Sequence, residues 1–120
     1  MQLVNLALLI ATITCVAANG FIAVADYVRA SFVLANSEEV RLPAATLPYL
    51  ATLKLAGAVG LAVGLLGVPS LGLAAGVGLI GFFIGAVVAH ARARVFYNIA
   101  FPGVYLLLAV ASTVFFASEL

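Results

Sequence analysis

Three ionisable side chains stand at or inside long apolar stretches, where charge is expensive. Asp26 ends the first stretch, His90 ends the third, and Lys54 lies about one and a half helical turns into the second. A lysine within a membrane span costs about 2.5–3.5 kcal/mol on insertion scales, so such residues are functional candidates. We therefore predict a catalytic acid–base cluster of Lys54, Asp26 and His90, with Asp26 as the counter-ion of Lys54.

Each of these residues also has a purely structural interpretation. The long stem of Lys54 would let its ammonium snorkel to the membrane interface. A Lys54–Asp26 pair would equally serve to hold two helices together. His90 would be an interfacial histidine beside Arg92 and Arg94, which is the commoner role of a single histidine.

Polar residues recur every seven positions in the first and last apolar stretches. Seven residues are nearly two helical turns, so each series shares one helix face. Polar groups are costly in hydrocarbon, so both faces should point into a bundle, where they either bond between helices or line a polar cavity. The two series are Asn5, Thr12, Asn19, Asp26 and Asn98, Tyr105, Ser112, Glu119. The ligand-binding candidates are Asn19, Tyr97, Asn98 and Tyr105.

The elements that must position these residues are membrane helices. Of the 120 residues, 67% are hydrophobic and 8% are charged, against about 25% charged in an ordinary soluble domain. The mean hydropathy is +1.33. A soluble fold of this size could not bury so much apolar surface. We predict one all-α domain over residues 1–120, an integral membrane, antiparallel four-helix bundle with spans at about 3–25, 49–66, 71–90 and 99–117.

The same composition excludes several function classes. A net charge of +1 provides no basic patch for nucleic acid. The single cysteine, Cys15, allows no internal disulfide, no CxxC redox pair and no thiolate metal site. We expect no metal site, and haem is disfavoured because His90 is the only histidine and no CxxCH motif is present. The first apolar stretch should be a retained span, since no Lys or Arg precedes it.

The connections between the spans differ in length and charge. The longest runs from Asp26 to Leu47; its first part, up to Leu34, is compatible with a continuation of the first helix, and residues 36–39 could cap a short interfacial helix. Residues 67–70 form a tight turn. Residues 91–98 form a polar loop, and Pro102 sits in the first turn of the last span.

Small residues predict how the middle helices pack. Gly60-x-x-x-Gly64 in the second span and Gly81-x-x-x-Gly85 in the third are spaced for close helix contact. The tight turn makes these helices antiparallel neighbours, so we expect both pairs in one packing seam. A minority interpretation is that some of these glycines line a ligand site.

The arginines predict the orientation of the bundle. Arg29, Arg41, Arg92 and Arg94 all lie in the first and third connections. The positive-inside rule therefore places these connections in the cytoplasm and both termini outside, in a bacterial cytoplasmic membrane.

Two segments resemble a known family. Residues 47–58, LPYLATLKLAGA, are similar to the start of the second span in the DoxX-like family of small four-helix membrane proteins. Residues 81–90, GFFIGAVVAH, resemble that family's third span, which ends in the same Ala-x-x-x-His pattern. The four spans with a long first and a short second connection also fit. The resemblance implies a subunit of a membrane redox complex, since the family is named for a subunit associated with thiosulfate:quinone oxidoreduction.

Three functions stay open at this point. The first is a membrane subunit that binds a quinone or another lipophilic small molecule near the cytoplasmic interface, with redox partner subunits. The second is a stand-alone membrane enzyme that performs acid–base chemistry, such as isomerisation or epoxide opening, on a hydrophobic substrate. The third is a structural membrane anchor. The expected partners are the lipid bilayer, the lipophilic molecule, partner subunits and further copies of the chain, but no nucleic acid.

Overall fold

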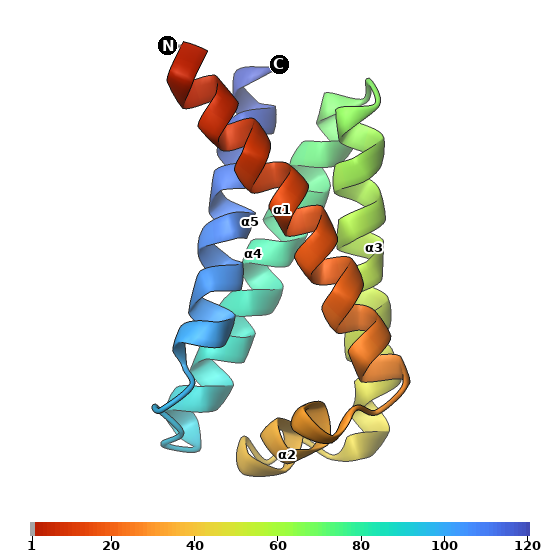
Figure 1. Cartoon of the computed structure of the whole chain (residues 1–120), viewed down its shortest axis with the longest axis vertical. Coiled ribbons are helices and arrows are strands. Elements are labelled where there is room, and N and C mark those ends of the chain that lie inside the picture. Colours follow the sequence, from red (N-terminus) through yellow and green to blue (C-terminus); the bar gives the residue numbers. More distant parts are fainter. Residues whose placement is uncertain (1) are drawn as a thin grey trace.

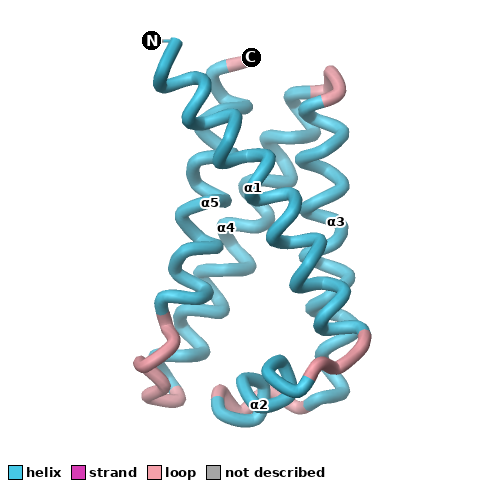
Figure 2. The backbone as a smooth tube through the Cα atoms, in the orientation of Figure 1, coloured by secondary structure: helices cyan, strands magenta, loops and turns pink. Residues whose placement is uncertain are grey.

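Four long apolar helices make up most of the molecule, as a computed structural model that describes residues 2–120 shows (Figure 1). Each of the four is long and apolar enough to cross a membrane. No strand occurs among the described residues, and short loops join the helices (Figure 2). This confirms the all-α, four-helix membrane fold. The elements are α1 (Gln2–Tyr27), α2 (Ser31–Glu39), the 3₁₀ turn η1 (Ala44–Thr46), α3 (Leu47–Leu65), α4 (Pro69–Arg92) and α5 (Ala100–Ser118).

The long helices pack in a closed ring. In the order α1, α3, α4 and α5, each contacts its two neighbours, and α5 returns to α1. Helix α1 crosses the front of the bundle diagonally, from beside α5 at the upper end to beside α3 at the lower end (Figure 1). Both termini lie at the upper end, and α2 lies across the lower end (Figure 1). The ends of the bundle therefore differ in how closely the helices approach.

The upper half of α3 and α4 forms the predicted glycine seam. A Cβ added to Gly60 would lie 2.6 Å from the Cβ of Ala75, and one added to Gly64 would lie 2.6 Å from the Cα of Gly72. The buried ring of Phe116 from α5 also fills the space beside Gly64. Backbone contact this close needs residues without side chains.

The predicted place of Gly81 and Gly85 in this seam is wrong. Among the described residues, no heavy atom lies within 4 Å of a Cβ added to either glycine. Helix α4 approaches α3 through Gly72, Ala75 and Leu79 instead. Those three positions follow helical spacing, whereas the Gly81–Gly85 face is rotated away from them around the helix axis. Both glycines line a cavity, which was the minority interpretation.

The two polar series face the bundle interior except at their outer ends. Thr12, Asn19, Asp26, Tyr105 and Ser112 are buried. Asn5 and Glu119 are exposed near the chain termini. Most of the buried groups bond within their own helix: the Thr12 and Ser112 hydroxyls donate to Leu8 O and Leu108 O, and the Asn19 amide donates to Cys15 O.

Two members of these series bond to another long helix: Asp26 of α1 to Lys54 of α3, and Tyr105 of α5 to α1. The Tyr105 hydroxyl of α5 donates to Ala18 O of α1, at 3.1 Å. Hydroxyls can satisfy themselves on the carbonyl four residues earlier, so the polar spacing did not require bonds between helices.

Three expectations for the connections need correction. Helix α1 ends at Tyr27 and does not continue to Leu34. Residues 36–39 form the last turn of α2, not its amino-terminal cap, because that helix already begins at Ser31 after an Ala30 that makes no side-chain cap bond. Helix α4 extends to Arg92, so the loop before α5 covers residues 93–99.

Candidate functional site

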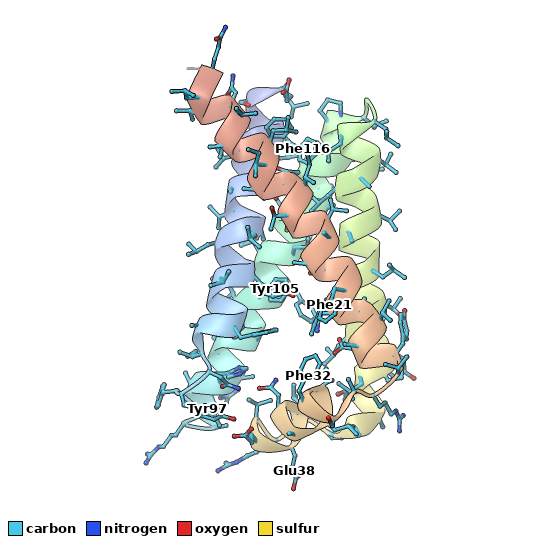
Figure 3. All side chains as sticks on the ribbon, viewed as in Figure 1. Phe21, Phe32, Glu38, Tyr97, Tyr105 and Phe116 are labelled. Carbon is cyan, nitrogen blue, oxygen red and sulfur yellow. The ribbon has the colours of Figure 1, made fainter. Side chains whose placement is uncertain are left out.

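A cavity of about 640 Å³ occupies the lower half of the bundle. All five helices contribute to its wall: α1 with Asp26, α2 with Asn36, α3 with Lys54, α4 with His90 and α5 with Tyr105. The remaining lining is mostly aliphatic or aromatic. Figure 3 shows Tyr105 and Phe32, two of the lining residues, beside the space between α1, α5 and α2. The cavity is therefore an apolar chamber with a few polar groups set in its wall.

Lys54 and Asp26 form an ion pair in this wall. The Lys54 Nζ donates to Asp26 Oδ2 at 2.7 Å, and the two side chains are 12% and 3% exposed. The ammonium also lies 5.5 Å from the centroid of the Phe82 ring, within cation–π range. The predicted pairing is thus present, and Lys54 is turned to Asp26 instead of snorkelling away from the bundle.

His90 lies inside the bundle at the end of α4, with 4% of its surface exposed. Its Nδ1 is 2.9 Å from Ala86 O, and a carbonyl only accepts, so Nδ1 carries a proton. Its Nε2 is 3.1 Å from the Asn36 side-chain oxygen on α2. The Asn98 amide donates to the same oxygen at 3.3 Å. The ring therefore does not point outward beside Arg92 and Arg94 but belongs to a buried network that reaches across to α2.

Whether His90 is charged or neutral decides which groups in this network donate and which accept. A protonated imidazole donates from Nε2 and suits an Asn36 oxygen. A neutral imidazole protonated at Nδ1 accepts at Nε2, so it needs the Asn36 amide group turned toward it, and Asn98 must then turn as well. In the arrangement described, Asn98 Oδ1 is buried and has no hydrogen-bond partner among residues 2–120. The network therefore leaves one amide atom of Asn98 free at the cavity wall.

Tyr97 completes the contact between α2 and the loop before α5. Its hydroxyl donates to both carboxylate oxygens of Glu39, at 2.6 and 2.8 Å. This hydrogen bond raises the pKa of Tyr97, because the carboxylate stabilises the protonated phenol. Asn36 and Glu39 together fasten α2 over the lower end of the chamber. Neither residue was identified from the sequence as part of the site.

Aromatic rings make up one side of the chamber. The Phe83 ring packs edge-on against Phe82 at 5.0 Å between centroids and tilted against Tyr105 at 5.2 Å. Phe101 stacks on Tyr105 at 5.3 Å. These rings provide surfaces on which a flat ligand can pack. Sequence reasoning singled out Tyr105 but missed the three phenylalanines, since apolar residues in apolar helices carry no distinguishing signal.

The structure brings together six of the seven candidate residues. Asn19 is the exception. It is fully buried on α1 above the cavity, donates to Cys15 O, and does not line the cavity. In the part of the chain the structure describes, no three His, Cys, Asp or Glu residues gather to hold a metal ion. The six that meet in the cavity wall are Asp26, Lys54, His90, Tyr97, Asn98 and Tyr105.

Comparison with known proteins identifies the family. No curated protein and no solved structure matches the chain. A model of the DoxX-like family matches residues 10–112, a stretch that includes the glycine seam and the cavity. This match confirms the resemblance of the segments around Lys54 and His90. The chain is a multi-pass membrane protein and belongs to the DoxX-like family.

Proposed function

We propose that this protein binds a quinone, or a comparable lipophilic carbonyl compound, in the chamber between its helices, and acts as a subunit of a membrane redox complex. The observation that carries the proposal is the Lys54–Asp26 ion pair set in an otherwise apolar wall. An ammonium has three donor positions and Asp26 takes one. The others are available to a ligand oxygen that enters the chamber.

The shape and lining of the chamber support a ring-shaped ligand. Its volume of about 640 Å³ lies within the range of small-molecule sites. The phenyl rings of Phe82 and Phe101 and the phenol of Tyr105 offer stacking surfaces. Asn98 supplies a second polar atom at the wall. Its unpartnered Oδ1 accepts from a ligand hydroxyl, and in the turned arrangement that goes with a neutral His90 its amide NH₂ group would donate to another ligand oxygen. A compound with an apolar ring and carbonyl oxygens matches all three features.

The membrane and its orientation form part of the proposal. Arg29, Arg41, Arg92 and Arg94 lie at the chamber end of the molecule, and the termini lie at the other end. The positive-inside rule then places the chamber at the cytoplasmic face of a bacterial cytoplasmic membrane, with the termini outside.

A second candidate is acid–base catalysis on a hydrophobic substrate. The observation that favours it is that His90 and the Lys54–Asp26 pair line one chamber. The imidazole would transfer a proton, while the ammonium would stabilise a developing oxyanion. A substrate turned over, instead of a ligand held, distinguishes this candidate from the first. A bare structural anchor would show neither behaviour.

Ligand binding by purified protein tests the proposal. Wild-type protein in detergent should bind decylubiquinone saturably in equilibrium dialysis, and Lys54→Met should bind at least about tenfold more weakly. Arg92→Gln is the matched control, since it removes a cation at the same end but outside the cavity lining, and it should bind as the wild type does. Equal binding by Lys54→Met and wild type would contradict the proposal.

A further inference from the structure

Three helices end in the same uncommon way. Arg29, Arg41 and Arg94 have φ angles of 52°, 64° and 58°, and they are the non-glycine residues with positive φ among residues 2–120. Each stands two positions beyond the last residue of α1, α2 or α4. The left-handed conformation is sterically unfavourable for a residue with a Cβ. Three independent helix ends therefore carry an arginine where the backbone favours glycine.

The backbone bonds at these ends are those of the Schellman motif. The Arg29 amide donates to Asp26 O at 3.1 Å and the Ala30 amide to Ala25 O at 3.0 Å. The same pair of bonds follows α2 and α4, from Arg41 and Leu42 and from Arg94 and Val95. This motif usually places glycine at the left-handed position.

Helix α3 provides an internal comparison. It ends at Leu65, and the left-handed residue two positions later is Gly67, with φ 126°. Gly67 lies at the upper end of the bundle, whereas α1, α2 and α4 end in its lower part (Figure 1). The chain thus uses the unstrained residue at one end and arginine, three times, at the other.

Nothing in the described structure holds these arginines in place. All three side chains are exposed. The one salt bridge among residues 2–120 joins Lys54 to Asp26, and the nearby Glu39 carboxylate accepts from Tyr97. The guanidinium groups are therefore free to bind something outside the chain.

Their depth indicates what that is. Helix α4 has 24 residues and is about 36 Å long, which exceeds the hydrocarbon thickness of about 30 Å. We therefore expect a residue just beyond its end to lie at the level of the lipid phosphates. Guanidinium forks pair with phosphate oxygens through two parallel bonds. Strain retained at several equivalent positions points to ligand contact.

We propose that Arg29, Arg41 and Arg94, together with Arg92, form a binding surface for the phosphate groups of anionic phospholipids. The left-handed conformation turns the chain sharply at the helix end and presents the arginine to the headgroup layer. The proposal stands apart from the chamber's ligand, because none of the four arginines lines the cavity.

The test compares thermal unfolding of the full-length protein in nanodiscs of phosphatidylcholine with and without phosphatidylglycerol. Phosphatidylglycerol should raise the melting temperature of the wild type. The triple variant Arg29→Gly, Arg41→Gly, Arg94→Gly should melt higher than the wild type in phosphatidylcholine, because strain is relieved, and should lose at least half of the rise. The matched variant with lysine at the same three positions keeps the positive charges and the backbone strain. It should keep part of the rise in melting temperature.

Other outcomes would overturn the proposal. One is a wild-type melting temperature that does not change with phosphatidylglycerol. Another is a triple glycine variant that keeps the full rise in melting temperature. A glycine variant that melts lower in phosphatidylcholine, or fails to fold, would assign the arginines to helix capping and the helix dipole instead. A last experiment measures the melting temperature of the wild type in phosphatidylcholine discs with added inorganic phosphate and compares it with chloride at equal ionic strength. An equal rise there would assign the site to free phosphate.

Discussion

The two ends of the bundle use the same glycine spacing for opposite purposes. At the upper end, Gly60 and Gly64 let α3 approach α4 until backbones touch. At the lower end, Gly81 and Gly85 have the same four-residue spacing but face open space in the chamber. The comparison teaches that small residues in a membrane helix remove volume, and that the rotation of the helix decides whether a neighbouring helix or a ligand fills it.

The polar groups follow the same division. The upper hydroxyls, on Thr12 and Ser112, bond within their own helices and are fully buried. The lower groups, on Asp26, Lys54 and His90, bond between elements and line the chamber. The polar groups of the upper end are therefore part of close helix packing, and those of the lower end are charged or hydrogen-bonded side chains that line the chamber.

The largest effect should come from unpairing the charges at the lower end. Removing one partner of a buried pair costs about 3–5 kcal/mol, because the other charge is left uncompensated. Lys54→Met and Asp26→Asn should each lower the free energy of unfolding by an amount near the bottom of that range, since Lys54 is 12% exposed. Chemical denaturation in detergent measures this.

The double variant is the control for this effect. Lys54→Met with Asp26→Asn should regain part of the lost stability but no ligand binding. A double variant as unstable as the two single losses added together would show that the residues do not act as a pair.

A bulky residue in the upper seam should have the next largest effect. Gly64→Leu places side-chain atoms where the backbone of Gly72 and the ring of Phe116 already lie. Overpacking of this kind costs about 1–3 kcal/mol and more where the obstacle is backbone. The melting temperature in detergent should fall sharply. Unchanged melting would mean that the helices do not approach here as described.

The same substitution at the lower end should have a different result. Gly81→Leu extends into the chamber, where no heavy atom of the described chain stands within 4 Å of the new Cβ. Stability should change by less than about 1 kcal/mol, since leucine is also the better helix former. Binding of decylubiquinone should weaken, because the side chain occupies ligand space. Loss of folding with Gly81→Leu would restore the single seam predicted from the sequence.

The smallest effect concerns the exposed contact between Tyr97 and Glu39. The Glu39 carboxylate raises the pKa of Tyr97 above its ordinary value of about 10. A raised folded-state pKa means that the contact stabilises the protein fully below the unfolded pKa and is lost as pH rises through the folded pKa. Wild type should therefore lose more stability than Tyr97→Phe in that alkaline range. Parallel pH profiles of the two proteins would contradict the contact.

Hydropathy and charge were enough to predict the membrane helices and part of the candidate site. Long apolar runs fix membrane helices because backbone groups must bond internally in lipid. Asp26 and Lys54 were predictable as partners, since few charges lie at that depth and an ammonium there needs an acid. The spacing of Tyr105 and Asn98 likewise placed both on the inner face.

Other features depend on information that local patterns lack. The rotation of α4 about its axis decides that Leu79 meets α3 and Gly81 does not, and both faces are equally apolar and small. The role of Asn36 and Glu39 depends on where α2 lies after the chain turns at Arg29. That placement is set by contacts between residues more than fifty positions apart in the sequence. Seven-residue spacing alone also could not tell Asn19, above the chamber, from Asp26, within it.

A structure of the protein with decylubiquinone tests the central claim most directly. The proposal predicts the quinone ring inside the chamber, against Phe82 or Tyr105, with one carbonyl oxygen at about 2.7–3.2 Å from the Lys54 Nζ. The Lys54–Asp26 contact should persist in that complex. A quinone found outside the chamber, or inside it with no oxygen near Lys54, would contradict the proposed role of the ion pair.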